Sequence, residues 1–66
     1  MKVEDMKIWL AEKPNHVEEF TVISNGWWTL FTLSTTDSSV LEYLNNNGFP
    51  VVYSDIFDGI ILVKFS

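Results

Sequence analysis

The chain has 66 residues, a length that allows one domain with a thin core, and it contains no cysteine, so disulfides and thiolate metal sites are excluded. Four lysines and no arginine stand against nine carboxylates, which gives a net charge of −5. The hydrophobic share of 47% is too high for a disordered chain, yet no apolar run reaches the roughly 18 residues of a membrane span and no signal peptide is evident. We therefore expect a single soluble, cytoplasmic domain over residues 1–66, with no metal and no cofactor.

The first predicted element is a helix over residues 3–13. Its apolar positions recur at helical spacing, and acidic residues occupy the first turn, where the helix dipole favours them. The apolar positions are Val3, Met6, Trp9 and Leu10. Pro14 is expected to end the helix because proline cannot continue the hydrogen-bond pattern.

A β-hairpin is predicted next, with strands over residues 19–24 and 27–33. Both segments are rich in β-branched and aromatic residues, which favour strands. Asn25-Gly26 lies between them and is typical of a two-residue type I′ turn, which needs positive φ at both central residues.

The second predicted helix follows a hydroxyl-rich segment, residues 34–39, that offers several N-cap candidates. Ser39 and Glu42 fit a capping box for a late start, and the helix is expected to run to about Asn47. Gly48 is predicted to close it in the left-handed conformation.

A second hairpin is predicted over residues 51–57 and 60–65, with Asp58-Gly59 as its turn. The two turns lie 33 residues apart, so the chain repeats one helix–hairpin pattern. This repeat predicts an α+β fold with pseudo-twofold αββαββ order, in which residues 3–33 form the first half and residues 36–66 the second. We expect a four-stranded antiparallel sheet with two helices packed on one face.

Alternation along the strands divides their side chains between two faces. The face predicted to carry the helices consists of Ile23, Trp28, Leu30, Val52, Ile56, Ile61, Val63 and Phe65. The second face is also apolar, although a solvated face normally alternates polar residues outward. It consists of Phe20, Val22, Trp27, Phe31, Leu33, Tyr53, Phe57, Ile60 and Leu62.

Two explanations of the apolar second face remain open. The register of one hairpin could differ from the expected one, or the first helix could dock there, and then no partner is needed. Otherwise the face is a surface for another protein or for a second copy, because aromatic anchors ringed by charge form interface hot spots.

The distribution of charge argues against direct nucleic-acid binding. Residues 14–63 contain six carboxylates and no lysine or arginine, so this region repels phosphates and cannot gain from counterion release. The same field would attract a basic partner, including a groove that receives DNA or RNA. Small acidic inhibitors of nucleic-acid enzymes, such as those of phages, share this size and charge, although no motif supports the comparison.

No catalytic constellation emerges from the residue pattern. His16 lies near Glu18 and Glu19, but a single histidine beside adjacent carboxylates has no specific ligand spacing and is typical of a solvated edge. The hydroxyls of residues 34–39 lack a base at motif spacing, and helix capping explains them. We expect that the protein is not an enzyme.

The sequence thus predicts an acidic protein-binding module, an inhibitor that occludes a basic, possibly nucleic-acid-binding, site on a larger protein. The alternative is a homodimeric structural or regulatory module that closes through its aromatic sheet face, with or without a small ligand between the sheets. The residues predicted to bind protein are Phe20, Trp27, Phe31, Tyr53 and Phe57, with Glu18, Glu19, Asp55 and Asp58 around them.

Overall fold

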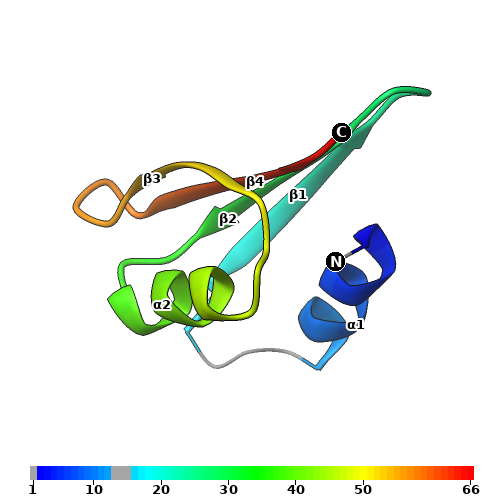
Figure 1. Ribbon diagram of the computed structural model, residues 1–66. Helices are drawn as coiled ribbons and strands as arrows, with labels where there is room; N and C mark the ends of the chain where they lie inside the picture. The colour runs from blue at the N-terminus through cyan, green and yellow to red at the C-terminus, as the bar shows by residue number, and fades with distance from the viewer. Residues whose placement is uncertain (1, 13–15) are drawn as a thin grey trace.

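The chain folds in the order helix, hairpin, helix, hairpin (Figure 1). The computed structural model describes residues 2–12 and 16–66. The elements are α1 (Val3–Ala11), β1 (Glu19–Ser24), β2 (Thr29–Ser34), α2 (Ser38–Asn46), β3 (Val51–Asp55) and β4 (Ile60–Phe65). Pro14, predicted to end the first helix, lies outside the described residues, and α1 ends at Ala11.

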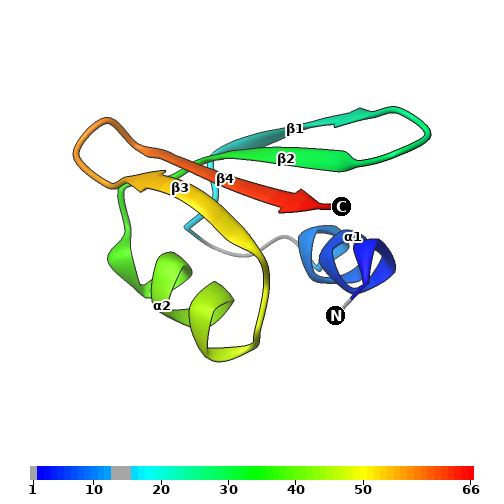
Figure 2. The same cartoon turned by 45° about the horizontal axis from the view of Figure 1, so that its top comes forward.

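The four strands form one antiparallel sheet in the order β1-β2-β4-β3. This order reads the same from either end when the two halves are exchanged, so β2 and β4 meet at the centre and β1 and β3 are the edges. Both helices lie on the same side of the sheet (Figures 1 and 2). The predicted α+β class and αββαββ arrangement are confirmed.

The core lies between the two central strands and the helices. Phe31 and Leu33 of β2 pair with Val63 and Ile61 of β4, and all four are fully buried. The helices and the segment after α2 contribute Met6, Leu10, Val40, Leu44 and Phe49. Directly opposite residues of neighbouring strands share a face, so this pairing identifies the helix-covered face of both hairpins.

The predicted core face is wrong for the first hairpin. Phe31 and Leu33 were expected on the second face, whereas they are buried beneath the helices. Leu30, expected in the core, pairs with Lys64 and lies on the face that the helices leave uncovered. Val52 of the second hairpin was also expected in the core, but it is exposed, because the register shift between Val51 and Tyr53 puts Val51 opposite Val63 instead. Within the first hairpin the alternation was assigned correctly, but both of its faces are apolar, so alternation could not show which one joins the core of the second. The pairing of β2 with β4 decides this.

Both predicted two-residue turns are also wrong, because the loops contain four residues. Ser24 pairs with Thr29, and Asp55 pairs with Ile60. Gly59 has φ of 76°, but Gly26 is not in the left-handed region, so the first loop is not a type I′ turn.

Side-chain oxygens of Asn25, the first residue of one loop, and of Asp55, the strand residue before the other loop, replace the expected turns. Asn25 Oδ1 accepts from the backbone N–H groups of Trp27 and Trp28, at 2.8 and 3.0 Å. Asp55 Oδ1 accepts from those of Phe57 and Asp58, at 3.1 and 3.2 Å. This is the Asx-turn chemistry of asparagine and aspartate. The feature that the two loops share is therefore the Asx side chain, not a left-handed glycine.

The ends of α2 are set by two local motifs. Asp37, not Ser39, is the N-cap, and its Oδ1 accepts from the Ser39 N–H at 2.8 Å. At the other end Gly48 has φ of 75°, as predicted, and the Phe49 N–H donates to the Leu44 carbonyl at 2.9 Å. This 6→1 bond is the Schellman closure, and it directs the Phe49 ring into the core. No described helix is long and apolar enough to cross a membrane.

Candidate functional site

The residues predicted to bind protein do not form one surface. Phe31 is fully buried in the core, so its prediction as an exposed contact residue is wrong. Phe20 pairs with Leu33 and therefore lies on the helix side of the sheet, whereas Tyr53 pairs with Leu62 on the opposite side. Both are about half exposed.

The two most exposed aromatic residues lie far apart. Trp27 is in the β1–β2 loop and Phe57 in the β3–β4 loop, and these loops project from opposite ends of the sheet (Figure 2). Their relative exposures are 86% and 101%. One partner surface could include both only by spanning the sheet.

The predicted acidic residues lie near one end of the sheet. Glu19 and Asp55 sit on the two edge strands, at the ends of one row that crosses the sheet through Ser34 and Ile60. Asp55 also closes the β3–β4 loop, in which Asp58 lies. Glu18 precedes β1, and its N–H donates to the Ser34 carbonyl at 2.8 Å.

The face of the sheet away from the helices, here called the outer face, is only partly apolar. Its apolar members are Ile23, Leu30, Tyr53, Ile60 and Leu62. Thr21, Thr32 and Lys64 lie among them, and Lys64 Nζ is 5.4 Å from the centroid of the Trp28 ring. The homodimer through a sheet face stays a prediction, with these residues in place of Trp27 and Phe31.

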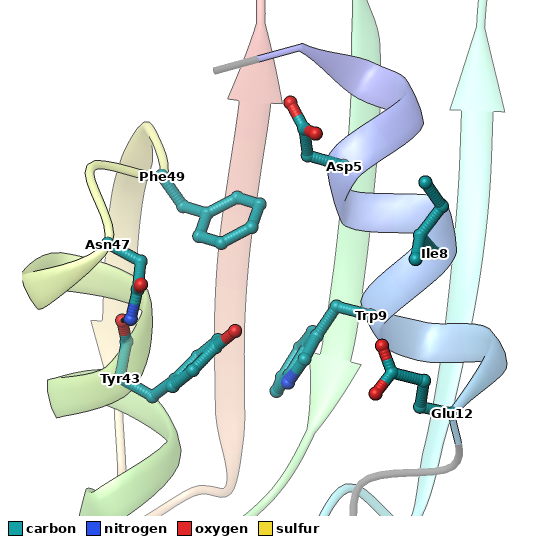
Figure 3. A pocket seen from close by; sticks show the side chains of 7 residues that line it. All are labelled: Asp5, Ile8, Trp9, Glu12, Tyr43, Asn47 and Phe49. Carbon is teal, nitrogen blue, oxygen red and sulfur yellow. Dashed lines mark hydrogen bonds between the residues drawn. The ribbon is translucent and has the colours of Figure 1, made fainter.

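A groove that the sequence did not indicate lies between α1 and α2, and we call it the interhelical groove. Its volume is about 230 Å³. It is lined by Asp5, Ile8, Trp9, Glu12, Tyr43, Asn47 and Phe49 (Figure 3). The view shows the groove in front of the sheet, with α1 on one side and α2 on the other.

Local sequence explains why these side chains converge. Asp5, Ile8, Trp9 and Glu12 are separated by three, four and seven positions, so they form one stripe along α1. This stripe is adjacent to the one that carries Met6 and Leu10 into the core. On α2 and its closing segment, Tyr43 and Asn47 lie one turn apart, and the Asn47 side chain donates to the Tyr43 carbonyl at 2.8 Å.

Three aromatic rings form the centre of the groove. Trp9 and Tyr43 stack with their centroids 5.2 Å apart and their planes at 14°. The Phe49 ring is tilted and lies 6.4 Å from each of them. Phe49 is buried, whereas Tyr43 is exposed and Trp9 is half-buried. The stack therefore holds the two helices together and leaves aromatic surface open to solvent.

The repeat contained a signal for this stack. Trp9 and Tyr43 occupy equivalent positions of the two halves, 34 residues apart. In a pseudo-twofold structure, equivalent positions on the inner flanks of the helices face each other across the axis. The repeat alone could not show that the helices lie close enough for the rings to touch.

Acidic groups flank the aromatic rings. Asp5 and Glu12 both line the groove from α1, and neither lysine nor arginine is among the described lining residues. Asp5 Oδ2 accepts from the Lys2 backbone N–H at 2.8 Å, which orients that carboxylate at the start of α1. Figure 3 shows the Asp5 carboxylate on the groove side of α1 and the Glu12 carboxylate near Trp9. Carboxylates beside aromatic faces can hold a cation, since both attract positive charge.

His16 contacts Asp37 rather than the glutamates near it in sequence. Its Nδ1 lies 3.1 Å from Asp37 Oδ2, and both side chains are partly exposed. Hydrogen bonds from Ser39, and to a lesser degree the His16 imidazole, hold the pKa of Asp37 below its usual value. Within the described residues, no three histidine or acidic side chains gather in a way that could hold a metal ion.

No protein-family model, curated protein or solved structure matches the chain. A functional assignment therefore rests on the geometry of its own residues. Among its surfaces, the interhelical groove combines shape, aromatic area and charge of one sign.

Proposed function

We propose that the protein is an acidic, non-enzymatic binding module that occludes a basic site on a larger protein. The interhelical groove receives a lysine or arginine side chain of that partner. One observation carries the proposal: the Trp9–Tyr43 stack is open to solvent and has Asp5 and Glu12 beside it with no lysine or arginine among the described lining residues.

The chemistry of the groove suits a long cationic side chain. An ammonium or guanidinium group gains from contact with aromatic faces, by about 0.5–1 kcal/mol at an exposed site and more when water is excluded. The aliphatic stem of lysine or arginine packs against apolar surface while its charge reaches a carboxylate. Ile8 and Phe49 supply such apolar surface, and Glu12 and Asp5 supply the carboxylates. Arginine gains most, because its planar group can both stack and make paired hydrogen bonds.

The charge of the whole chain supports the same kind of partner. The net charge is −5, and residues 14–63 contain neither lysine nor arginine. A field of one sign raises the rate of encounter with a partner of the opposite sign, and salt weakens it. A site that normally holds the phosphates of DNA or RNA has the charge that this surface would attract.

A titration with a short arginine-rich peptide tests the groove directly. We expect saturable changes in the NMR signals of the Trp9 indole and the Tyr43 ring, and weaker binding as salt is added. Glu12→Gln should weaken binding severalfold, because it removes a carboxylate beside the stack. Glu42→Gln is the matched control, since Glu42 is exposed on α2 outside the groove and the change in net charge is the same.

Equal losses in the two variants would mean that only net charge matters, and the groove assignment would then be wrong. Signal changes spread over the outer face, with none at Trp9 or Tyr43, would also contradict it. The occlusion part of the proposal needs a target: a partner isolated from the host should lose its nucleic-acid binding when the protein is added, and Trp9→Leu should relieve that inhibition. Inhibition unaffected by Trp9→Leu would separate the inhibitory activity from the groove.

A further inference from the structure

The outer edge of β1 is open along its whole length. All six residues of β1 are exposed, and the strand pairs only with β2. No described segment lies beside its free edge in Figure 2. An edge of this kind presents unpaired backbone groups that can pair with another strand.

The pattern of backbone bonds identifies which residues present these groups. The Asn25 N–H donates to the Trp28 carbonyl at 3.0 Å, which continues the β1–β2 ladder beyond Ser24 and Thr29. Antiparallel ladders alternate, so the odd-numbered residues of β1 face β2 and the even-numbered ones face outward. The outward set is Phe20, Val22 and Ser24. On its other side β2 pairs with β4, and there the Thr35 N–H donates to the Gly59 carbonyl at 3.0 Å. The odd-numbered residues of β2 therefore bond to β4 and the even-numbered ones bond to β1. The even-numbered residues of β2 lie opposite the odd-numbered residues of β1, so the two bonds agree.

Apart from the charge of Glu19 at its start, β1 lacks the features that usually prevent pairing at a sheet edge. It contains no proline, lysine or bulge, and its exposed side chains include Phe20, Val22 and Ile23, at 45%, 43% and 56%. The opposite edge differs. Pro50 immediately precedes β3, and the register of β3 shifts between Val51 and Tyr53. A bulge bends and twists a strand away from regular pairing.

We propose that β1 pairs antiparallel with β1 of a second copy of this chain, centred on Val22. In this register Val22 faces the partner's Val22, and Phe20 faces the partner's Ser24. The outward backbone groups of three residues in each copy then form about six hydrogen bonds. The result is a continuous eight-stranded sheet with a twofold axis through its centre, perpendicular to the sheet.

The side chains fit this arrangement on both faces. A twofold axis perpendicular to the sheet keeps each face on its own side, so side chains that meet across the axis must belong to the same face. The residues whose backbone groups point away from β2 satisfy this condition, because they all have even numbers and share one face. Phe20, Val22 and Ser24 lie on the helix side, and in the dimer Val22 meets its copy there while Phe20 lies opposite the partner's Ser24. On the outer face, Ile23 lies beside the partner's Thr21. Exposed apolar surface of each copy is thereby covered.

Charge favours the antiparallel direction over the parallel one. Glu18 and Glu19 precede and begin β1, whereas its other end carries the neutral Ser24 and Asn25. Antiparallel pairing places the glutamates of the two copies at opposite ends, and parallel pairing would bring them together. The two copies still repel each other through their net charge of −5 each. Salt therefore strengthens the dimer, the opposite of its effect on the basic partner of the proposed function.

Sedimentation equilibrium of the wild-type chain tests the proposal. The average mass should rise from 7.6 kDa toward twice that value as the protein concentration increases, and more steeply at high salt. Val22→Lys should raise the dimer dissociation constant at least tenfold, since it places two ammonium groups together at the axis. Val52→Lys, the same change at an exposed position of the opposite edge, should leave it unchanged.

Val22→Pro is a second variant, which removes an N–H that faces solvent in the monomer. Edge strands tolerate such a proline, so the circular dichroism spectrum should remain that of the wild type while dimerisation falls. A wild-type chain that stays monomeric at high concentration and high salt would overturn the proposal. So would equal effects of Val22→Lys and Val52→Lys, or a dimer lost in Tyr53→Lys and retained in Val22→Lys, which would indicate pairing through the outer face. Glu12→Gln should alter peptide binding without altering the dimer, so failure of this proposal and failure of the proposed function can be told apart.

Discussion

The two hairpins follow one sequence pattern, but they differ in how the rest of the chain covers them. Both have four-residue loops opened by an Asx side chain, and both contribute one central and one edge strand. In the second hairpin the edge strand is bulged, is partly buried at both ends and follows directly from the closure of α2. The first has an edge strand that is exposed throughout.

This difference shows that position, rather than pattern, decides what a repeated unit can do. The α2–β3 connection is short and passes through Phe49 and Pro50, so the second helix is held against its own hairpin. The α1–β1 connection is longer. In the first hairpin, the helices bury only residues on the helix side of β2, and β1 is exposed. The same hairpin thus has a bulged, partly buried edge strand in one half and a regular, exposed edge strand, a candidate interaction edge, in the other.

The largest expected effect on stability comes from truncating a buried residue of the first hairpin to alanine, compared with the same truncation of its neighbour on the outer face. Phe31→Ala should destabilise the protein by about 3–5 kcal/mol, a large part of the roughly 3–10 kcal/mol expected for a domain of this size. Leu30→Ala, its neighbour on the outer face, should cost about 1 kcal/mol because Leu30 is only half-buried. Urea unfolding followed by circular dichroism measures both. A larger loss for Leu30→Ala would mean that the originally expected face is the core after all.

The loops provide a second test of the comparison. Gly59→Ala should cost about 1–2 kcal/mol because φ is 76° and the new Cβ would lie 3.2 Å from Thr36 Cγ2. Gly26→Ala meets no atom within 4 Å and no positive φ, so it should be neutral or stabilise by up to about 1 kcal/mol. Thermal unfolding of both variants is the measurement. Similar losses would indicate that the two loops share a left-handed glycine.

A third prediction concerns the cap that starts α2. Asp37→Ala should lower the melting temperature at neutral pH because the Ser39 N–H loses its acceptor. The pKa of Asp37 is lowered in the folded state, so its stabilisation is present above the unfolded-state pKa and is lost as the pH falls through the folded-state pKa. The difference in melting temperature between wild type and variant should therefore shrink below about pH 4. Ser38→Ala is the control, and a pH-independent difference would assign the effect to helix propensity instead.

The smallest expected effect lies on the outer face, where the two hairpins meet. Lys64→Gln should cost about 0.5 kcal/mol, because the ammonium group contacts the Trp28 ring at an exposed site. The Trp28 indole signal should shift in the NMR spectrum. Lys7→Gln makes the same charge change on α1 and should leave that signal in place. An unchanged Trp28 signal in Lys64→Gln would show that the contact contributes nothing.

Local features were predictable where the physical cause is local. Val40 and Leu44 lie on the buried stripe of α2 as their spacing indicates, and Gly48 closes that helix because few other residues adopt positive φ readily. The start of α2 was misassigned, since Asp37 and Ser39 are both good N-caps and the sequence does not show which one precedes the first helical turn. The candidate site was missed because its parts come from both halves. Trp9 was expected only as one of the apolar positions of the first helix, and its contact with Tyr43 becomes visible only when the helices are placed side by side.

The amino-acid sequence by itself determined the α+β class, the order of the elements and the alternation within the first hairpin, because hydrophobic periodicity and helix-closing residues act over a few positions. Only the tertiary structure decided which face of the first hairpin is buried, which rings meet between the helices and which edge stays open. These outcomes depend on the pairing of β2 with β4. That pairing joins residues about 30 positions apart, and no local preference selects it, since both faces of the first hairpin are apolar enough to be buried.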